Sequence, residues 1–194
     1  MKVLIVLGSP RKKGNSETLA LTVTDSLSEE LPITPHYLRL TDFEIAPCIG
    51  CGGCEKTGMC VIKDDMIDLY VKIDEADIIF LVSPIYFYGP SAQLKAFIDR
   101  CQARWSRKYL LKTRVRQNDK RGGYLLSTGA TRGKKLFDAS ILIAKSFFDA
   151  IDVPYSESFS VRGVDEKGAI DLRDEVLAET RQFAYHITQN MQNG

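Results

Sequence analysis

The sequence lacks an excess of charge of either sign and lacks any long hydrophobic run. Its 194 residues include 26 basic and 25 acidic side chains, so no overall field attracts nucleic acid or an acidic membrane. No apolar run is long enough to span a bilayer, and only Met1 and Lys2 precede the first apolar segment. We therefore expect a cytoplasmic protein with no nucleic-acid or membrane partner. Cytoplasmic thiols stay reduced, which excludes a disulfide framework for the five cysteines.

Two familiar nucleotide-binding loops are also missing after the first apolar run, residues 3–7. Gly14 is followed by Asn15 and Ser16 rather than by lysine, which excludes a nucleoside-triphosphate loop. Only Gly8 and Gly14 stand where a dinucleotide fingerprint needs three glycines. What remains is a hydroxyl-rich loop before a helix, which suits a single phosphomonoester such as that of flavin mononucleotide (FMN). The alternative is that Asn15 or Ser16 merely caps the helix and binds nothing.

Strand and helix patterns alternate along the chain. We expect strands at 3–7, 34–40, 78–82, 122–127 and 153–159, and helices at about 15–30, 66–72, 91–104, 136–150 and 171–192. This alternation predicts an α/β fold, a doubly wound five-stranded parallel sheet of order 2-1-3-4-5 in three αβα layers. No linker or repeat divides the chain, so we expect one domain, residues 1–194.

Two further strands end in unusual loops. Three aromatic residues lie between Pro84 and Pro90, where they are poorly suited to a core and well suited to a flat ligand. Small residues fill 128–133 after the fourth strand. Ligands of such sheets bind outside the carboxyl ends of the strands, so residues 9–16, 84–89 and 128–133 are predicted to meet there. Their convergence favours a flavin, since three independent loops would otherwise resemble ligand loops by chance.

Four of the five cysteines lie in an irregular segment, residues 41–63. They follow a C-x-x-C-x-x-C pattern and a five-residue gap, at Cys48, Cys51, Cys54 and Cys60. Three thiolates at successive three-residue steps and a fourth on a return suit a [4Fe–4S] cluster. Structural zinc is the main alternative, although its ligands usually form two separated pairs; four unligated thiols are the third. Cys101 stands apart and is expected to be a buried small hydrophobe.

Residues 107–121 are strongly basic, with Asp119 as their single acidic residue. A solvated loop is the first interpretation of this basic segment. A contact for a nicotinamide phosphate or for a partner subunit is the alternative.

The motifs at 8–16, 83–86 and 127–130 resemble the NAD(P)H-dependent FMN reductase branch of the flavodoxin-like superfamily. With the cysteine pattern, the chain is similar to an iron–sulfur flavoprotein of that branch. The resemblance implies a phosphate site on Ser9, Arg11, Lys13, Asn15 and Ser16. It implies that the isoalloxazine ring and ribityl chain lie on Pro84, Ile85, Tyr86, Phe87 and Gly89, with Thr128, Gly129, Ala130 and Gly133 on the other side. It also implies a homodimer or homotetramer.

The expected function is electron transfer between FMN and a [4Fe–4S] cluster in an FMN-dependent oxidoreductase, with ferredoxin or another small redox protein as partner. Hydride transfer to a flavin requires no side-chain acid or base, so no catalytic residue is assigned. One alternative is an NAD(P)H-dependent reductase of flavin or quinone without a functional cluster. The other is a non-enzymatic redox sensor.

Overall fold

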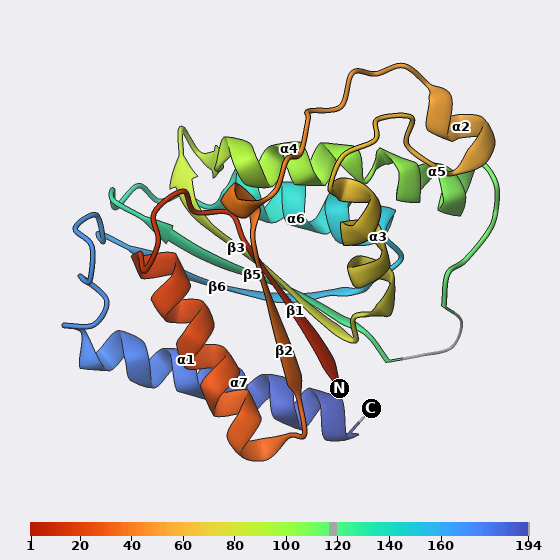
Figure 1. Cartoon of the computed structure of the whole chain (residues 1–194). Helices are drawn as coiled ribbons and strands as arrows, with labels where there is room; N and C mark the ends of the chain where they lie inside the picture. The colour runs from red at the N-terminus through yellow and green to blue at the C-terminus, as the bar shows by residue number, and fades with distance from the viewer. Residues whose placement is uncertain (117–119, 194) are drawn as a thin grey trace.

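Five parallel strands form the middle layer of the computed structural model, which describes residues 1–116 and 120–193 (Figure 1). The strands are β1 (Lys2–Leu7), β2 (Thr34–Arg39), β3 (Ile78–Tyr86), β5 (Gly122–Gly129) and β6 (Tyr155–Arg162). Their order is β2-β1-β3-β5-β6, and β4 (Gly89–Pro90) pairs antiparallel with the end of β3. The predicted order of the parallel strands is therefore confirmed, with β4 as a short addition.

Helices cover both faces of the sheet. They are α1 (Asn15–Glu30), α2 (Gly53–Thr57), α3 (Met66–Glu75), α4 (Ala92–Arg100), α5 (Gln102–Tyr109), α6 (Asp138–Ala150) and α7 (Asp174–Asn193), with a 3₁₀ turn at Leu40–Asp42. Helices α1 and α7 lie on one face, and α3, α4 and α6 lie on the other (Figure 1). A strand buried on both faces is apolar at every position, which explains the unbroken apolar run of β1.

The strand β1 divides its side chains between two cores. Leu4 and Val6 pack in the core beneath α3, α4 and α6, whereas Val3, Ile5 and Leu7 pack in the core beneath α1 and α7. All five are at most 3% exposed. Since successive strand side chains point to opposite faces, this one segment joins the two apolar layers.

One predicted helix is divided in the structure. The pattern predicts a continuous helix over 91–104, but α4 ends at Arg100 and α5 begins at Gln102. At the break, the Tyr70 hydroxyl donates to the Arg100 carbonyl at 2.6 Å, and the Cys101 N–H donates three residues back to Ile98. Cys101 is 1% exposed, which confirms its role as a small buried residue.

The described part of the basic segment contacts residues 73–77, which lead into the amino end of β3, through Arg116 and Arg121. Its cations form ion pairs with carboxylates of the same chain: Arg107 with Asp74, Lys108 with Asp149, Arg114 with Asp152, and Arg116 with Asp77. Arg121 is buried and donates to the carbonyls of Ile73 and Ala76. Residues 112–115 and 120 are exposed, as the solvated interpretation predicts, and the ion pairs also tie the described part of the segment to the body of the protein. Asp119 lies outside the described residues.

Among the helices that the structure describes, none has the length and apolar character needed to cross a membrane.

Candidate functional site

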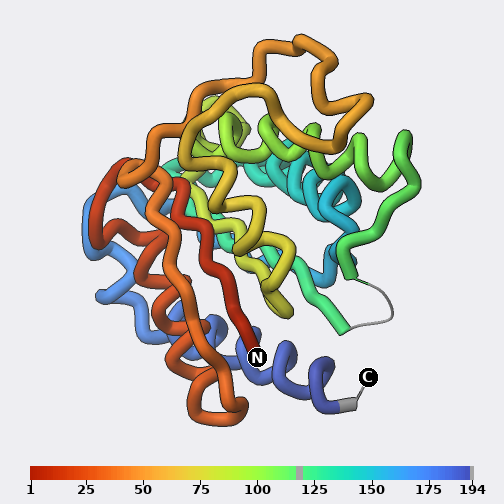
Figure 2. The backbone as a smooth tube through the Cα atoms, turned by 45° about the vertical axis from the view of Figure 1, so that its right-hand side comes forward, coloured from red at the N-terminus to blue at the C-terminus, as the bar shows by residue number. Residues whose placement is uncertain are grey.

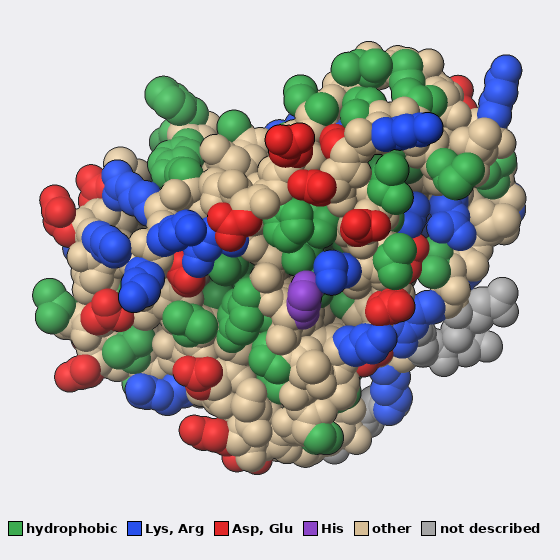
Figure 3. Space-filling view, in the orientation of Figure 1, with side chains coloured by type: hydrophobic (Ala, Val, Ile, Leu, Met, Phe, Trp, Pro, Cys, Tyr) green, Lys and Arg blue, Asp and Glu red, His purple; other side chains and the backbone are tan. Residues whose placement is uncertain are grey.

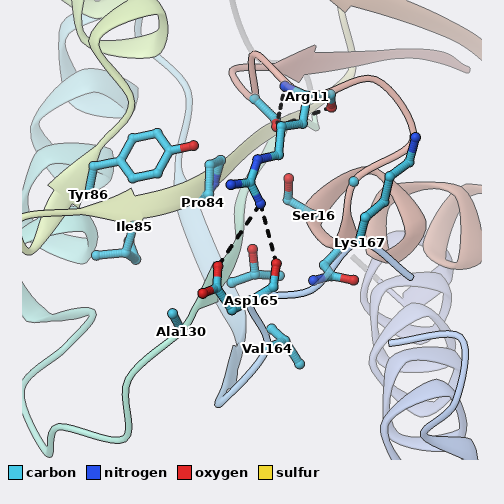
Figure 4. A pocket seen from close by; sticks show the side chains of 13 residues that line it. Arg11, Ser16, Pro84, Ile85, Tyr86, Ala130, Val164, Asp165 and Lys167 are labelled. Atoms are coloured by element: carbon cyan, nitrogen blue, oxygen red, sulfur yellow. Dashed lines mark hydrogen bonds and ion pairs between the residues drawn. The ribbon is translucent and has the colours of Figure 1, made fainter. Parts of the chain in front are cut away.

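A cavity of about 240 Å³ opens at the carboxyl edge of the sheet, where the loop after β1 meets the carboxyl ends of β3 and β5; β3 extends to Tyr86, beyond the predicted strand 78–82 (Figure 4). Many of the predicted flavin residues line it together: Ser9, Arg11, Asn15, Ser16, Pro84, Ile85, Tyr86, Thr128 and Ala130. We call this cavity the edge pocket. Segments far apart in sequence thus meet at one place, as the parallel-sheet rule requires.

The edge pocket has a fourth wall that sequence reasoning missed. Val164, Asp165 and Lys167, from the loop after β6, complete the lining with Gly14. The Val164 N–H donates to the Gly129 carbonyl at 3.1 Å, which holds this loop against the end of β5. The sequence did contain a signal for this fourth wall, because the loop follows a parallel strand and must therefore emerge at the carboxyl edge of the sheet.

Several predicted residues lie outside the lining. They are Lys13, Phe87, Gly89, Gly129 and Gly133. Lys13 is exposed in the left-handed region, at φ 55°, and Phe87 is fully exposed at a hairpin tip. A Cβ on Gly129 would lie 2.5 Å from Leu136 Cδ2, so this glycine allows close packing with Leu136. Gly133 borders the Tyr88 hydroxyl, 3.5 Å from an added Cβ.

Helix α1 points an uncapped N-terminus at the edge pocket. Its N-cap is Gly14, which provides no side-chain hydrogen bond, so the alternative that Asn15 or Ser16 caps the helix is wrong. The first N–H groups of a helix have no intrahelical acceptor, and together with the helix dipole they favour an anion. Lys and Arg side chains gather over the segment between β1 and α1 (Figure 3).

Asn15 and Ser16 differ in what their side chains do. The Asn15 amide donates to the Glu166 carbonyl at 2.9 Å and accepts from the Ile170 N–H at 3.3 Å, so it anchors the loop after β6. Within the described residues the Ser16 hydroxyl has no hydrogen-bond partner, although the residue is only 2% exposed. Ser16 therefore places an unengaged hydroxyl on the pocket wall.

Arg11 brings a cation to the edge pocket. Ser9 Oγ accepts from the Arg11 N–H at 3.1 Å and donates to its carbonyl at 3.2 Å, which holds the turn. The Arg11 guanidinium donates to the Asp165 carbonyl at 3.3 Å and extends into the pocket beside Ser16 (Figure 4). Arg11 also forms an ion pair with the Asp165 carboxylate at 4.0 Å, and both side chains are exposed, so this ion pair is weak.

The hairpin between β3 and β4 has bulky residues where turns usually carry asparagine and glycine. Phe87 and Tyr88 both have positive φ, at 49° and 65°, in a two-residue turn between the paired Tyr86 and Gly89. Large side chains rarely adopt this conformation, and such strain concentrates at functional sites. The turn directs Tyr86 into the edge pocket, and hydrophobic side chains project from this part of the surface in Figure 3.

Glu17 fastens the loop between β1 and α1 to the helix that follows it. Its carboxylate accepts from the Lys13 N–H at 2.7 Å and from Arg39 at 2.5 Å. Burial raises the pKa of Glu17, but the hydrogen bonds from Arg39 and Lys13 outweigh this and hold the pKa below its ordinary value of 4.5. The folded state therefore binds this proton less readily than the unfolded chain does.

We expect the Glu17→Gln variant of the apoprotein to be less stable than wild type above pH 4.5. Because the folded pKa is depressed, this difference is fully present above the unfolded pKa and shrinks as the pH falls through the folded value. Urea unfolding from pH 7 to pH 3 measures it for both proteins. A difference that stays constant or grows toward acid pH would contradict the assignment.

Gly8 allows β1 to end against α4. Its N–H donates to the Val82 carbonyl at 2.8 Å, and its carbonyl accepts from Ser91 Oγ at 2.5 Å. A Cβ here would lie 2.7 Å from Leu94 Cβ and 3.2 Å from the Val82 carbonyl oxygen. Any larger residue must therefore push the end of β1 away from α4.

We expect Gly8→Ala to lower the free energy of unfolding by about 1–3 kcal/mol, the usual range for overpacking. Gly133→Ala is the matched control, because its nearest neighbour would be at ordinary contact distance, and it should change stability by roughly 0.5 kcal/mol or less. Urea denaturation followed by circular dichroism measures both. Equal stability of the two variants would refute the steric explanation.

The four clustered cysteines line a second cavity, of about 440 Å³, bounded by helices α2, α4 and α5. We call it the cysteine pocket. All four thiols are free, and the segment that carries them passes over α4 and α5 (Figure 2). No group of three or more Cys, His, Asp or Glu in residues 1–116 and 120–193 is arranged as a metal site. The structure thus places the four sulfurs around one cavity without gathering them into a ligand set.

The donors of the cysteine pocket fit an iron–sulfur cluster by their chemistry. Cysteine sulfurs are the ligands of such clusters, and four free cysteines line the pocket. Gly50, Gly52 and Gly58 adopt positive φ, between 64° and 70°, which allows the tight turns between cysteines.

The chain matches the NADPH-dependent FMN reductase family over residues 1–160. It is 45% identical over 100 residues to an iron–sulfur flavoprotein of Methanocaldococcus jannaschii, covering 52% of this chain and 51% of that protein. An iron–sulfur flavoprotein of Methanosarcina thermophila is 34% identical over 132 residues, covering 68% of this chain and 65% of the relative. The chain therefore spans about half to two thirds of the length of these relatives.

Solved structures share the fold at low identity. An FMN-dependent NADH-azoreductase of Bacillus anthracis in complex with FMN superposes with a TM-score of 0.69 at 13% identity, covering 96% of this chain and 99% of that one. An NAD(P)H:quinone oxidoreductase of Methanothermobacter marburgensis gives 0.65 at 18% identity, covering 96% of each chain. The fold is flavodoxin-like, as predicted. Since the family match extends over well over half of its length, the chain belongs to the NADPH-dependent FMN reductase family.

Proposed function

We propose that this protein is an FMN-dependent oxidoreductase that passes electrons between FMN and a [4Fe–4S] cluster. The observation that carries the proposal is the pair of cavities in one α/β domain. One has an uncapped helix N-terminus, hydroxyls and a cation, and the other is lined by four free cysteines. The names of the relatives as iron–sulfur flavoproteins support the same reading.

The edge pocket would bind FMN by its phosphate and by both sides of its ring. The N–H groups at the start of α1, the hydroxyls of Ser9 and Ser16, and the Arg11 guanidinium would hold the phosphate. Pro84, Ile85 and Tyr86 would lie along one side of the ring, with Thr128 and Ala130 on the other. These residues provide position and exclude water; none serves as an acid or base in our proposal.

The cysteine pocket would hold the cluster through Cys48, Cys51, Cys54 and Cys60. When bound, FMN supplies an acceptor for a hydride or for single electrons, and the cluster supplies one-electron exchange. This combination suits a small one-electron partner such as a ferredoxin on one side. We place the protein in the cytoplasm, where free thiols persist, and propose a homodimer or homotetramer.

A second candidate is an NAD(P)H-dependent reductase of flavin or quinone in which the cysteines carry no cluster. The observation that favours it is the absence, in the described part of the chain, of a preformed group of three metal ligands. In that case NAD(P)H would reduce FMN directly, and the cysteine segment would serve only the packing over α4 and α5.

Purification without oxygen followed by FMN, iron, sulfide and zinc analysis tests the proposal. We expect bound FMN and roughly four iron and four sulfide per chain, with flavin reduced by a ferredoxin. Steady-state NADPH oxidation without iron would support the second candidate. Zinc in place of iron, or failure to bind FMN, would overturn the proposed function.

A further inference from the structure

A buried arginine lies at the base of the cysteine pocket. Arg100, the last residue of α4, lines this pocket with a side chain that is 0% exposed. Its Nη1 donates to the Ala46 carbonyl at 2.8 Å, and its Nη2 donates to the Ile62 carbonyl at 3.3 Å. One carbonyl lies two residues before Cys48 and the other two residues after Cys60. A single guanidinium thus joins the two ends of the cysteine segment.

Asp64 adds a carboxylate to the contacts that Arg100 makes with the ends of the cysteine segment. Its carboxylate accepts from Arg100 Nη1 at 2.5 Å and from Nη2 at 2.9 Å, and it also accepts from the Ala46 N–H at 2.9 Å. A bidentate arginine–carboxylate pair fixes orientation as well as charge. The ends of the segment are therefore positioned before any group enters the pocket.

One N–H of the Arg100 guanidinium has no partner in the described part of the chain, and Arg100 shares the pocket lining with Cys60. Arg100 Nε is buried and has no hydrogen-bond partner in the part of the chain that the structure describes. Arg100 and Cys60 both line the cysteine pocket. A guanidinium with a permanent positive charge and an N–H that has no partner among the described residues therefore belongs to the same pocket lining as the four cysteines.

A second donor reaches another cysteine from α5. Ser106 is fully buried, and its hydroxyl donates to Cys54 Sγ at 3.5 Å. Helix α5 also packs closely on the end of α2, where a Cβ on Gly58 would lie 2.4 Å from Arg107 Cγ. The hydroxyl is thus held in place under Cys54 by the surrounding packing.

We propose that Arg100 and Ser106 are positioning residues for the iron–sulfur cluster, one at Cys60 and the other at Cys54. This inference rests on the proposed function, because it assumes that the four cysteines hold a cluster. Donors and positive charge near cluster sulfurs stabilise the reduced, more negative state. Removing either residue should therefore move the reduction potential of the cluster to a more negative value and loosen the cluster.

The test compares Arg100→Lys, Arg100→Gln and Ser106→Ala with Arg104→Gln in the full-length protein, purified and reconstituted without oxygen. Arg104 is the matched control: it is 8% exposed and forms a bidentate pair with Asp74, but it does not line the cysteine pocket. Iron and sulfide content, iron release to a chelator, and the midpoint potential from an EPR-monitored titration are measured for each.

We expect a more negative potential in Ser106→Ala, and faster iron release in Arg100→Lys, where the charge stays but the forked contacts are lost. Arg100→Gln should show both effects or lose the cluster, while Arg104→Gln matches wild type in both. The inference would be overturned if the cluster of Ser106→Ala had the wild-type midpoint potential and Arg100→Lys released iron at the wild-type rate. Wild-type protein without iron and sulfide would instead mean that the proposed function itself is wrong.

Discussion

Replacing Ser16 by aspartate is expected to abolish retention of FMN. Ser16 lines the edge pocket in the first turn of α1 with a hydroxyl that the protein leaves unpaired, so a carboxylate there would face the phosphate. Two like charges about 4 Å apart at an effective dielectric of about 20 repel by about 4 kcal/mol. That repulsion corresponds to a roughly thousandfold weaker affinity, enough for FMN to be lost on dialysis.

The matched control is Leu21→Asp, which adds the same charge at an exposed position on α1. Leu21→Asp should bind FMN with the affinity of wild type. Ser16→Ala should have an FMN affinity between those of Leu21→Asp and Ser16→Asp. Fluorescence titration of the apoproteins with FMN measures all three affinities. Equal affinity of Ser16→Asp and Leu21→Asp for FMN would show that the phosphate lies elsewhere.

Replacing Cys51 by serine is expected to remove the broad visible absorbance of an iron–sulfur cluster and to spare the flavin bands. Cys51 is an exposed free thiol on the wall of the cysteine pocket, and loss of one of four thiolates leaves a cluster without its full ligand set. The edge pocket is built from other loops, so FMN binding should be unchanged. Absorption spectra with iron and sulfide analysis on anaerobic protein check this result.

Cys101→Ala provides the comparison for this variant. Cys101 is buried in the core at the break between α4 and α5, outside the cysteine pocket, and its removal should leave iron and sulfide at wild-type levels. If Cys51→Ser also kept full iron and sulfide, the ligand assignment would be refuted, whatever the condition of the flavin.

Much of the fold could be predicted because β1, β3 and β5 are apolar on both faces. Such runs occur where helices cover a parallel sheet from both sides, and their alternation with helices restricts the strand order. Since the carboxyl ends of parallel strands share one edge, the meeting of Ser9, Pro84 and Thr128 in one pocket was also predictable. These inferences need only local patterns and a general rule of topology.

Other features depended on contacts between distant segments. At the break at Cys101, Tyr70 donates a hydrogen bond to the Arg100 carbonyl, and the fourth wall of the edge pocket comes from a loop whose place after a parallel strand was its only signal. Asn15 lines the edge pocket, as expected, and its side chain also contacts Glu166 and Ile170, which the sequence did not indicate. A polar side chain can serve a ligand or its own chain, and sequence alone does not distinguish the two.

The amino-acid sequence by itself determined the layers of this protein, the edge at which its loops meet and the presence of four closely spaced thiols, because periodicity and spacing are local properties. Only the tertiary structure decided which polar groups remain free to act. Ser16 is left unpaired while Asn15 is not, and Arg100 is buried in the lining of the cysteine pocket with Cys60 although forty residues separate them. Residues that are far apart in the chain determine which polar groups remain free, because burial and hydrogen bonding depend on what packs nearby.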